Sequence, residues 1–360
     1  MYIFFALILF LPMLALRRRT DSDTRILDSK STTSIKGILC IYVMLHNLLG
    51  DPMLPKDKIT ELFCEHAGGV GVGLFFFLSA YGIIRAYQAQ GNRSLIRLLF
   101  VHIPKMWCVA VFINVITYLK FMRGEFETVD MWLRILNLDL FNGGERINLH
   151  GWYVASIIAL YIIFAAVYFV CSKLRTEKKF IIAACIMASV AIGFRLAAVQ
   201  TDYARLYTRE LPAFAIGCLY AAFYDKINAF ASKHFKLGIF LSVGTFLVFY
   251  LPSEPVATYA AAIIIIFVSQ RYTYYSKVTH FLGKICLGVY LFVHYSSLVL
   301  KQYLLQEYLW VLLNAGFVIE VAIMIHSVQY AIDYSVYRVK NWIVQKFARK
   351  DKDEACNDSV

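Results

Sequence analysis

The chain has 360 residues, of which 60% are apolar and 17% charged, with a mean hydropathy of +0.61 and a formal net charge of +12. Soluble domains carry roughly 25% charged residues, so this composition excludes a soluble globular protein and indicates a polytopic membrane protein. The positive charge is typical of cytoplasmic loops that orient a membrane protein, and we expect no nucleic-acid partner.

Apolar segments predict an all-α fold, a polytopic transmembrane helix bundle with one extra N-terminal helix beside ten others. The predicted helices are 2–16, 35–50, 69–89, 101–120, 150–171, 180–198, 209–224, 236–251, 255–269, 282–300 and 308–332. The first is followed, not preceded, by Arg17–Arg19, so we interpret it as a retained helix rather than a signal peptide.

Lys and Arg gather in every second connecting segment, which predicts that these segments face the cytoplasm. We therefore expect a multi-pass protein of the cytoplasmic membrane, in a bacterial cell, with a cytoplasmic C-terminus. The predicted organisation is a leading helix and basic linker over 1–34, one bundle over 35–335 and a cytoplasmic tail over 336–360.

The segment Gly69–Gly82 combines a membrane-grade apolar run with clustered glycines and one serine, Ser79. Glycine inside a helix costs about 1 kcal/mol relative to alanine. The cluster therefore indicates a backbone that approaches a neighbouring helix or a ligand closely. Ser79 is either a ligand contact or a hydroxyl that bonds its own helix.

Ionisable residues within the bilayer are candidates for function, and His46 is the sharpest of them. Lys36 opens the same predicted helix, and ten residues place His46 roughly 15 Å further along. An imidazole is a suitable general base for a hydroxyl at neutral pH. The alternative interpretation is an interfacial or capping histidine.

Several polar or aromatic residues are predicted at the same outer level as His46, namely Asn47, His150, Trp152 and Glu210. Glu210 is either a partner that orients His46 or a first-turn acid favoured by the helix dipole. Trp152 is either a sugar-binding ring or part of an aromatic belt. The eight cysteines show no metal-ligand spacing, and we expect no metal and no disulfide.

Basic residues on the inner side form a second candidate site. Arg85, Arg93 and Arg97 lie in two adjacent inner segments. They are explained either by the positive-inside bias or as a clamp for a phosphorylated cofactor, because guanidinium groups match phosphate oxygens. With Ser79 and Gly73 they form our predicted cofactor-binding set.

Six segments carry a resemblance to a known family, namely Ile35–Ile38 with His46, Gly71–Ile83, Arg97–Pro104 with Trp107, Gly151–Tyr153, Leu211–Gly217 and Leu282–His294. By these segments, which occur in the same order as in that family, the chain resembles the membrane acyltransferase-3 family over about 35–300. The resemblance implies a ten-helix bundle that transfers an acyl group, most often acetyl, from cytoplasmic acyl-CoA to a hydroxyl of an extracytoplasmic glycan or lipid-linked sugar.

The resemblance also implies catalytic roles for Lys36 and His46, which match an essential basic residue and histidine. Nine residues separate them here, whereas the family usually has ten. Ala80 and Cys286 stand where glycine and serine are frequent. With these roles, Glu210 joins the predicted catalytic set, and His150, Trp152 and Asn47 form the predicted acceptor-binding set.

The predicted mechanism places acyl-CoA phosphates on the inner arginines and its thioester near His46. Direct transfer and a transient acyl-histidine both remain compatible with the sequence. Alternatives from other classes are a transporter or flippase for lipid-linked glycans, and an inactive scaffold for glycan assembly.

Overall fold

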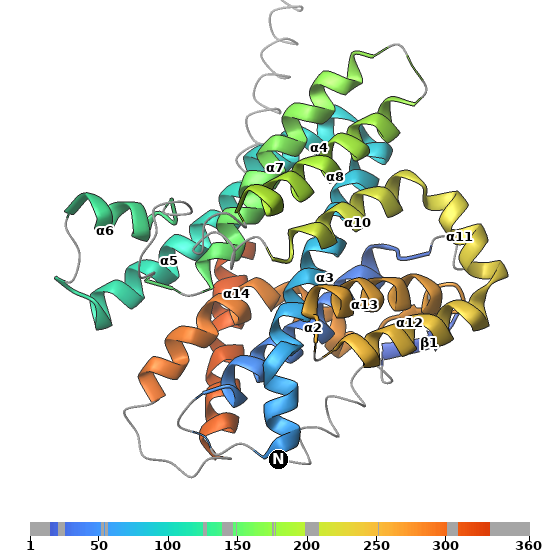
Figure 1. Ribbon diagram of the computed structural model, residues 1–360. Coiled ribbons are helices and arrows are strands. Elements are labelled where there is room, and N and C mark those ends of the chain that lie inside the picture. The colour runs from blue at the N-terminus through green and yellow to red at the C-terminus, as the bar shows by residue number, and fades with distance from the viewer. Residues whose placement is uncertain are drawn as a thin grey trace, which may run out of the picture.

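A computed structural model shows the arrangement of the chain (Figure 1). It describes residues 15–20, 26–51, 54, 57–124, 128–138, 147–148, 150–174, 176, 178–198, 209–250, 252–300 and 309–331. The described part is almost entirely helical. Its one sheet is a two-stranded antiparallel ribbon of β1 (Leu16–Arg18) and β2 (Tyr272–Tyr274).

Within these ranges, seven helical segments are long and apolar enough to cross a membrane. They are α2 (Ser29–Leu49), α3 (Lys58–Gln90), a continuous stretch of α4 (Asn92–Arg97), η1 (Leu98–His102) and α5 (Ile103–Phe121), α7 (Gly151–Ser172), α8 (Lys179–Ala198), α14 (Lys277–Leu300) and the helix Leu309–Ala331. Three shorter apolar helices are α10 (Leu211–Ala222), α12 (Phe235–Phe249) and α13 (Glu254–Val268).

These ten segments coincide with ten of the eleven predicted from hydropathy, which confirms the polytopic bundle. Residues 2–14 of the predicted leading helix and the predicted tail from 336 lie outside the described ranges. Leu16, predicted as the last residue of that helix, is instead the first residue of β1 and pairs with Tyr274, so the prediction is wrong at this position. Two short polar helices, α6 (Thr128–Ile135) and α11 (Tyr224–Lys233), complete the described fold.

Side-chain caps set the start of the two helices that carry the main sequence motifs. The Asp28 carboxylate accepts a hydrogen bond from the Ser31 N–H at 2.8 Å, so α2 begins before the predicted apolar run. The Asp57 carboxylate caps α3 in the same way through the Thr60 N–H at 2.8 Å. Caps of this kind satisfy backbone donors that the first helical turn leaves unpaired.

α3 lies at the centre of the bundle and packs against α2, α10 and α13 (Figure 1). α2 also packs closely on α14. Gly37 and Gly283 permit this crossing, because a Cβ on either would overlap the backbone of Thr279 or Thr33 on the facing helix. Small residues at such crossings let membrane helices approach closely. This packing brings the ends of α2, α3 and α14 together.

Candidate active site

The His46 side chain lies where α2 ends against α3. A Cβ on Gly68 would overlap the imidazole ring, so the absence of a side chain at Gly68 makes the space that His46 occupies. His150 is close enough to interact electrostatically with both His46 and His294, and the ring centroids of His150 and His294 are 6.0 Å apart. Three imidazoles, from α2, α14 and the turn before α7, therefore gather at one end of the bundle.

A buried asparagine that sequence reasoning did not identify holds His150 in this place. The Asn148 Nδ2 donates to the Leu291 carbonyl at 2.9 Å, and the Asn148 Oδ1 accepts from the His150 N–H at 2.9 Å. Asn148 is only 3% exposed. Its two bonds fix the turn before α7 to α14, and thereby the position of the His150 ring.

A polar cavity of about 150 Å³ lies between α2, α3, α5, α7 and α14. It is lined by Lys36, Ser79, Tyr153, Tyr161, Cys286 and Tyr290, together with Val72, Phe75, Met106 and Leu287. The structure therefore brings together two predicted residues, Lys36 and Ser79, that are 43 positions apart in the sequence.

The polar groups of this cavity lie close to one another. Tyr153 and Tyr161 both lie close to the Ser79 side chain. Lys36 is close enough to Cys286 for the two to interact electrostatically. A cavity of this size holds a small ligand fragment and is too small for a ligand as large as a nucleotide cofactor.

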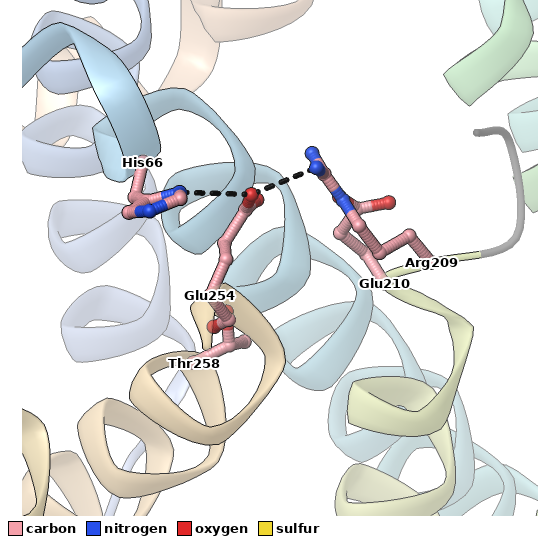
Figure 2. A network of polar contacts seen from close by, with 5 residues as sticks. All are labelled: His66, Arg209, Glu210, Glu254 and Thr258. Carbon is pink, nitrogen blue, oxygen red and sulfur yellow. Dashed lines mark hydrogen bonds and ion pairs between the residues drawn. The ribbon is translucent and has the colours of Figure 1, made fainter. Parts of the chain in front are cut away.

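A second polar network joins α3, α13 and the turn before α10 (Figure 2). Arg209 Nη1 is 2.9 Å from Glu254 Oε2, and Arg209 Nε donates to Glu210 Oε1 at 2.7 Å. On the other side of Glu254, His66 Nδ1 is 3.4 Å from Oε2. Two buried carboxylates thus share one guanidinium, an arrangement that offsets part of the desolvation cost of each.

Gly69 provides the space for the Glu254 carboxylate, just as Gly68 does for His46. Sequence reasoning identified neither His66 nor Glu254 as part of a site. The available signal was an acid at the start of an apolar helix, between Pro252 and Pro255. Glu210, predicted to orient His46, is bonded to Arg209 and also lies close to Tyr290.

The predicted acceptor-binding residues occupy different environments. His150 belongs to the imidazole cluster, with its ring 4.9 Å from that of Tyr290. Trp152 packs on Phe76 of α3, at a centroid distance of 6.3 Å. The Asn47 amide donates to the Val43 carbonyl of its own helix at 2.7 Å.

The predicted cofactor-binding arginines lie on two different helices. Arg85 of α3 donates to Gln88 at 2.8 Å, and its guanidinium lies 4.2 Å from the ring centroid of Tyr224 on α11. Arg93 and Arg97 are exposed on α4. Gly73, where we expected free room for a ligand, faces the Thr258 side chain of α13, so a neighbouring helix fills that space.

The comparisons with known proteins agree with this architecture. A family profile described as an acyltransferase domain matches residues 31–328. The match covers α2 to the helix Leu309–Ala331, and so includes the imidazole cluster, the cavity and the second network. No curated protein and no solved structure gives a significant match.

Proposed function

Because the chain belongs to the acyltransferase-3 family, we propose that this membrane acyltransferase moves an acetyl group from acetyl-CoA to a hydroxyl of an extracytoplasmic glycan or lipid-linked sugar. The observation that carries the proposal is the cavity beside the imidazole cluster, which brings Lys36, Ser79 and three tyrosines together inside a bundle of apolar helices. Tyr290 connects the two, since it lines the cavity and its ring lies 4.9 Å from that of His150.

In this proposal His46 is the general base. One imidazole nitrogen accepts the proton of the acceptor hydroxyl while its oxygen attacks the thioester carbonyl. The bond from the carbonyl carbon to sulfur then breaks, and the coenzyme A thiolate leaves and takes the proton from the imidazole. A two-step path through an acyl-histidine uses the same residue as nucleophile.

The two ends of the bundle suit the two substrates. Arg85, Arg93 and Arg97 lie towards the end at which α2 begins, because Tyr81 on the turn of α3 before Arg85 donates to the Leu27 carbonyl at 3.0 Å. These arginines are our candidates for coenzyme A phosphates on the cytoplasmic side. Lys36 would then contact the pantetheine arm in the cavity, and the acceptor would enter at the opposite end, near His46, His150 and Glu210.

A test uses purified protein in liposomes with radiolabelled acetyl-CoA and a polysaccharide acceptor. We expect His46→Gln to lower acyl transfer by at least 100-fold, since general-base catalysis contributes about 10²–10⁴-fold. His234→Gln is the matched control, because His234 lies at the start of α12 against Phe230. Full activity of His46→Gln would contradict the assignment.

Coenzyme A binding separates the proposal from a transporter or flippase. An acyltransferase that binds coenzyme A in its folded state is stabilised against heat by RT ln(1 + [L]/Kd), where [L] is the concentration of free coenzyme A. We expect added coenzyme A to raise the melting temperature of the protein, and Arg93→Gln with Arg97→Gln to reduce this rise. No rise at saturating coenzyme A would favour the transport alternative.

A further inference from the structure

We propose that Tyr290 is a catalytic residue whose hydroxyl donates a hydrogen bond to the acyl carbonyl oxygen of the donor, at the junction of the polar cavity and the imidazole cluster. The inference rests on the proposed function and adds the group that stabilises negative charge in the transition state. It also assigns the cavity beside Tyr290 as the chamber that holds the thioester.

The first observation is that the Tyr290 hydroxyl lacks a partner within the described part of the chain. Tyr290 is 7% exposed and lines the cavity, yet its hydroxyl makes no hydrogen bond to any described residue. Tyr153 and Tyr161 also line the cavity, but Tyr290 is the cavity tyrosine whose ring also lies against His150 of the imidazole cluster. Its hydroxyl is therefore a donor placed for a ligand at the junction of the two.

The second observation is that the Tyr290 ring is held from two sides. Its centroid lies 4.9 Å from His150, with an interplanar angle of 32°, and 5.5 Å from Tyr153, with an interplanar angle of 75°. Both partners belong to the start of α7, which Asn148 fixes to α14. A donor with a fixed ring does not need to reorganise during the reaction, and such preorganised donors are effective in catalysis.

The third observation is the position of Tyr290 between the two halves of the site. On one side it shares the cavity with Lys36, Ser79 and Cys286. On the other it contacts His150, which interacts electrostatically with His46. A thioester in the cavity with its carbonyl at Tyr290 would therefore present its reactive carbon towards the histidine that activates the acceptor.

The chemistry requires such a donor. When the acceptor oxygen attacks, the carbonyl π electrons move to the carbonyl oxygen, which becomes an oxyanion. The Tyr290 O–H donates to this oxygen and keeps its own proton. When the carbonyl re-forms, the bond to sulfur breaks and the coenzyme A thiolate leaves. Removing one oxyanion donor typically lowers kcat by about 10²–10³-fold.

The decisive variant is Tyr290→Phe, which keeps the ring contacts and removes the hydroxyl. The matched control is Tyr168→Phe on α7, because the Tyr168 hydroxyl is also buried without a hydrogen-bond partner but does not line the cavity. We expect Tyr290→Phe to lower kcat by about 100-fold, with KM for acetyl-CoA and the melting temperature unchanged. We expect Tyr168→Phe to keep full activity.

Infrared spectroscopy gives a readout without turnover. With no acceptor present, acetyl-CoA labelled with ¹³C at the carbonyl should show a lower carbonyl stretching frequency when bound to the wild-type protein than when free in solution. This shift should be lost in Tyr290→Phe and kept in Tyr168→Phe. Three results would each overturn the inference. They are absence of the shift in the wild-type protein, full activity of Tyr290→Phe, and a fall in the melting temperature of Tyr290→Phe that accompanies its loss of kcat. A Tyr290-dependent shift without any acyl transfer by the wild-type protein would instead reject the proposed function.

Discussion

Two adjacent glycines, Gly68 and Gly69, decide how the polar groups of the site are held. Each faces the functional end of a side chain from another helix, His46 in one case and Glu254 in the other. The glycine cluster of α3 therefore serves close contact between protein groups. A polar side chain packed against bare backbone has few alternative positions, which favours a fixed geometry for catalysis.

Gly68→Ala tests this role of the backbone. The added Cβ would overlap the His46 ring, so we expect acyl transfer to fall by at least 10-fold and stability to fall by about 1–3 kcal/mol from overpacking. Gly82→Ala is the control, because a Cβ there meets no atom within 4 Å, and alanine favours a helix by about 1 kcal/mol. Equal effects of both variants on activity and melting temperature would contradict the role of Gly68.

Glu254→Gln tests the second network at the residue scale. The amide keeps the shape of the side chain but removes the charge that binds Arg209 and His66. Because Glu254 is 4% exposed, we expect a loss of about 1–3 kcal/mol in stability, measured by thermal unfolding in detergent. Glu61→Gln, at an exposed position of α3, should leave the melting temperature unchanged. A melting temperature of Glu254→Gln equal to that of the wild-type protein would show that the network is not stabilising.

The helix α6 shows how a short polar element is attached to an apolar bundle. Asn114 of α5 donates to the carbonyls of Arg134 and Ile135 at 3.1 and 3.2 Å, and Trp107 donates to the Leu136 carbonyl at 2.7 Å. These bonds satisfy carbonyl groups that the last turn of a helix leaves unpaired. The contact of α6 with α5 therefore depends on side-chain donors as well as apolar packing.

Asn114→Leu should loosen this element selectively. Asn114 is 2% exposed, so the substitution leaves two buried carbonyl groups without their donor, at a cost of about 1–3 kcal/mol. We expect faster hydrogen exchange at the amides of α6, with those of α2 and α3 unchanged. Lys120→Leu, at an exposed position near the end of α5, is the control. Unchanged exchange in α6 would show that Asn114 does not anchor it.

At the scale of the whole molecule, polar groups lie inside the bundle and large apolar side chains cover much of its outside. On α12, for example, Phe240, Leu247 and Val248 are 75%, 69% and 66% exposed. Such surface is compatible with lipid and unfavourable in water. The interior instead carries the cavity and the imidazole cluster, where the proposed function places the meeting of the two substrates.

Thiol labelling tests whether acyl-CoA enters this interior. Cys286 lines the cavity, whereas Cys185 is exposed on α8. In variants that keep only one of these cysteines, we expect acetyl-CoA to slow the reaction of Cys286 with a small methanethiosulfonate and to leave Cys185 unaffected. The adduct is measured by mass spectrometry. Equal labelling rates of Cys286 with and without acetyl-CoA would place the donor elsewhere.

Hydropathy and motif order are sufficient to establish the class of fold and the family. Hydropathy located all ten apolar helices of the described chain, because a segment that crosses a membrane must be apolar over its length. Hydropathy also makes His46, Lys36 and Ser79 candidate site residues, since polar residues are rare within such segments, and their roles stay predictions. Motif order, from Ile35 to His294, indicated the acyltransferase-3 family before any structural information.

Which polar groups meet follows from how the helices pack, not from the residue pattern of any one helix. Glu254 and His66 are almost two hundred positions apart, and Tyr290 and His150 are brought together by contacts between α14 and the turn before α7. Hydropathy predicts that a helix lies within the membrane, but it does not predict which neighbour the helix contacts, because lipid tails and other helices are equally apolar. The choice of neighbour therefore depends on close packing at small residues such as Gly37, Gly69 and Gly283, which emerges only when all helices are placed together.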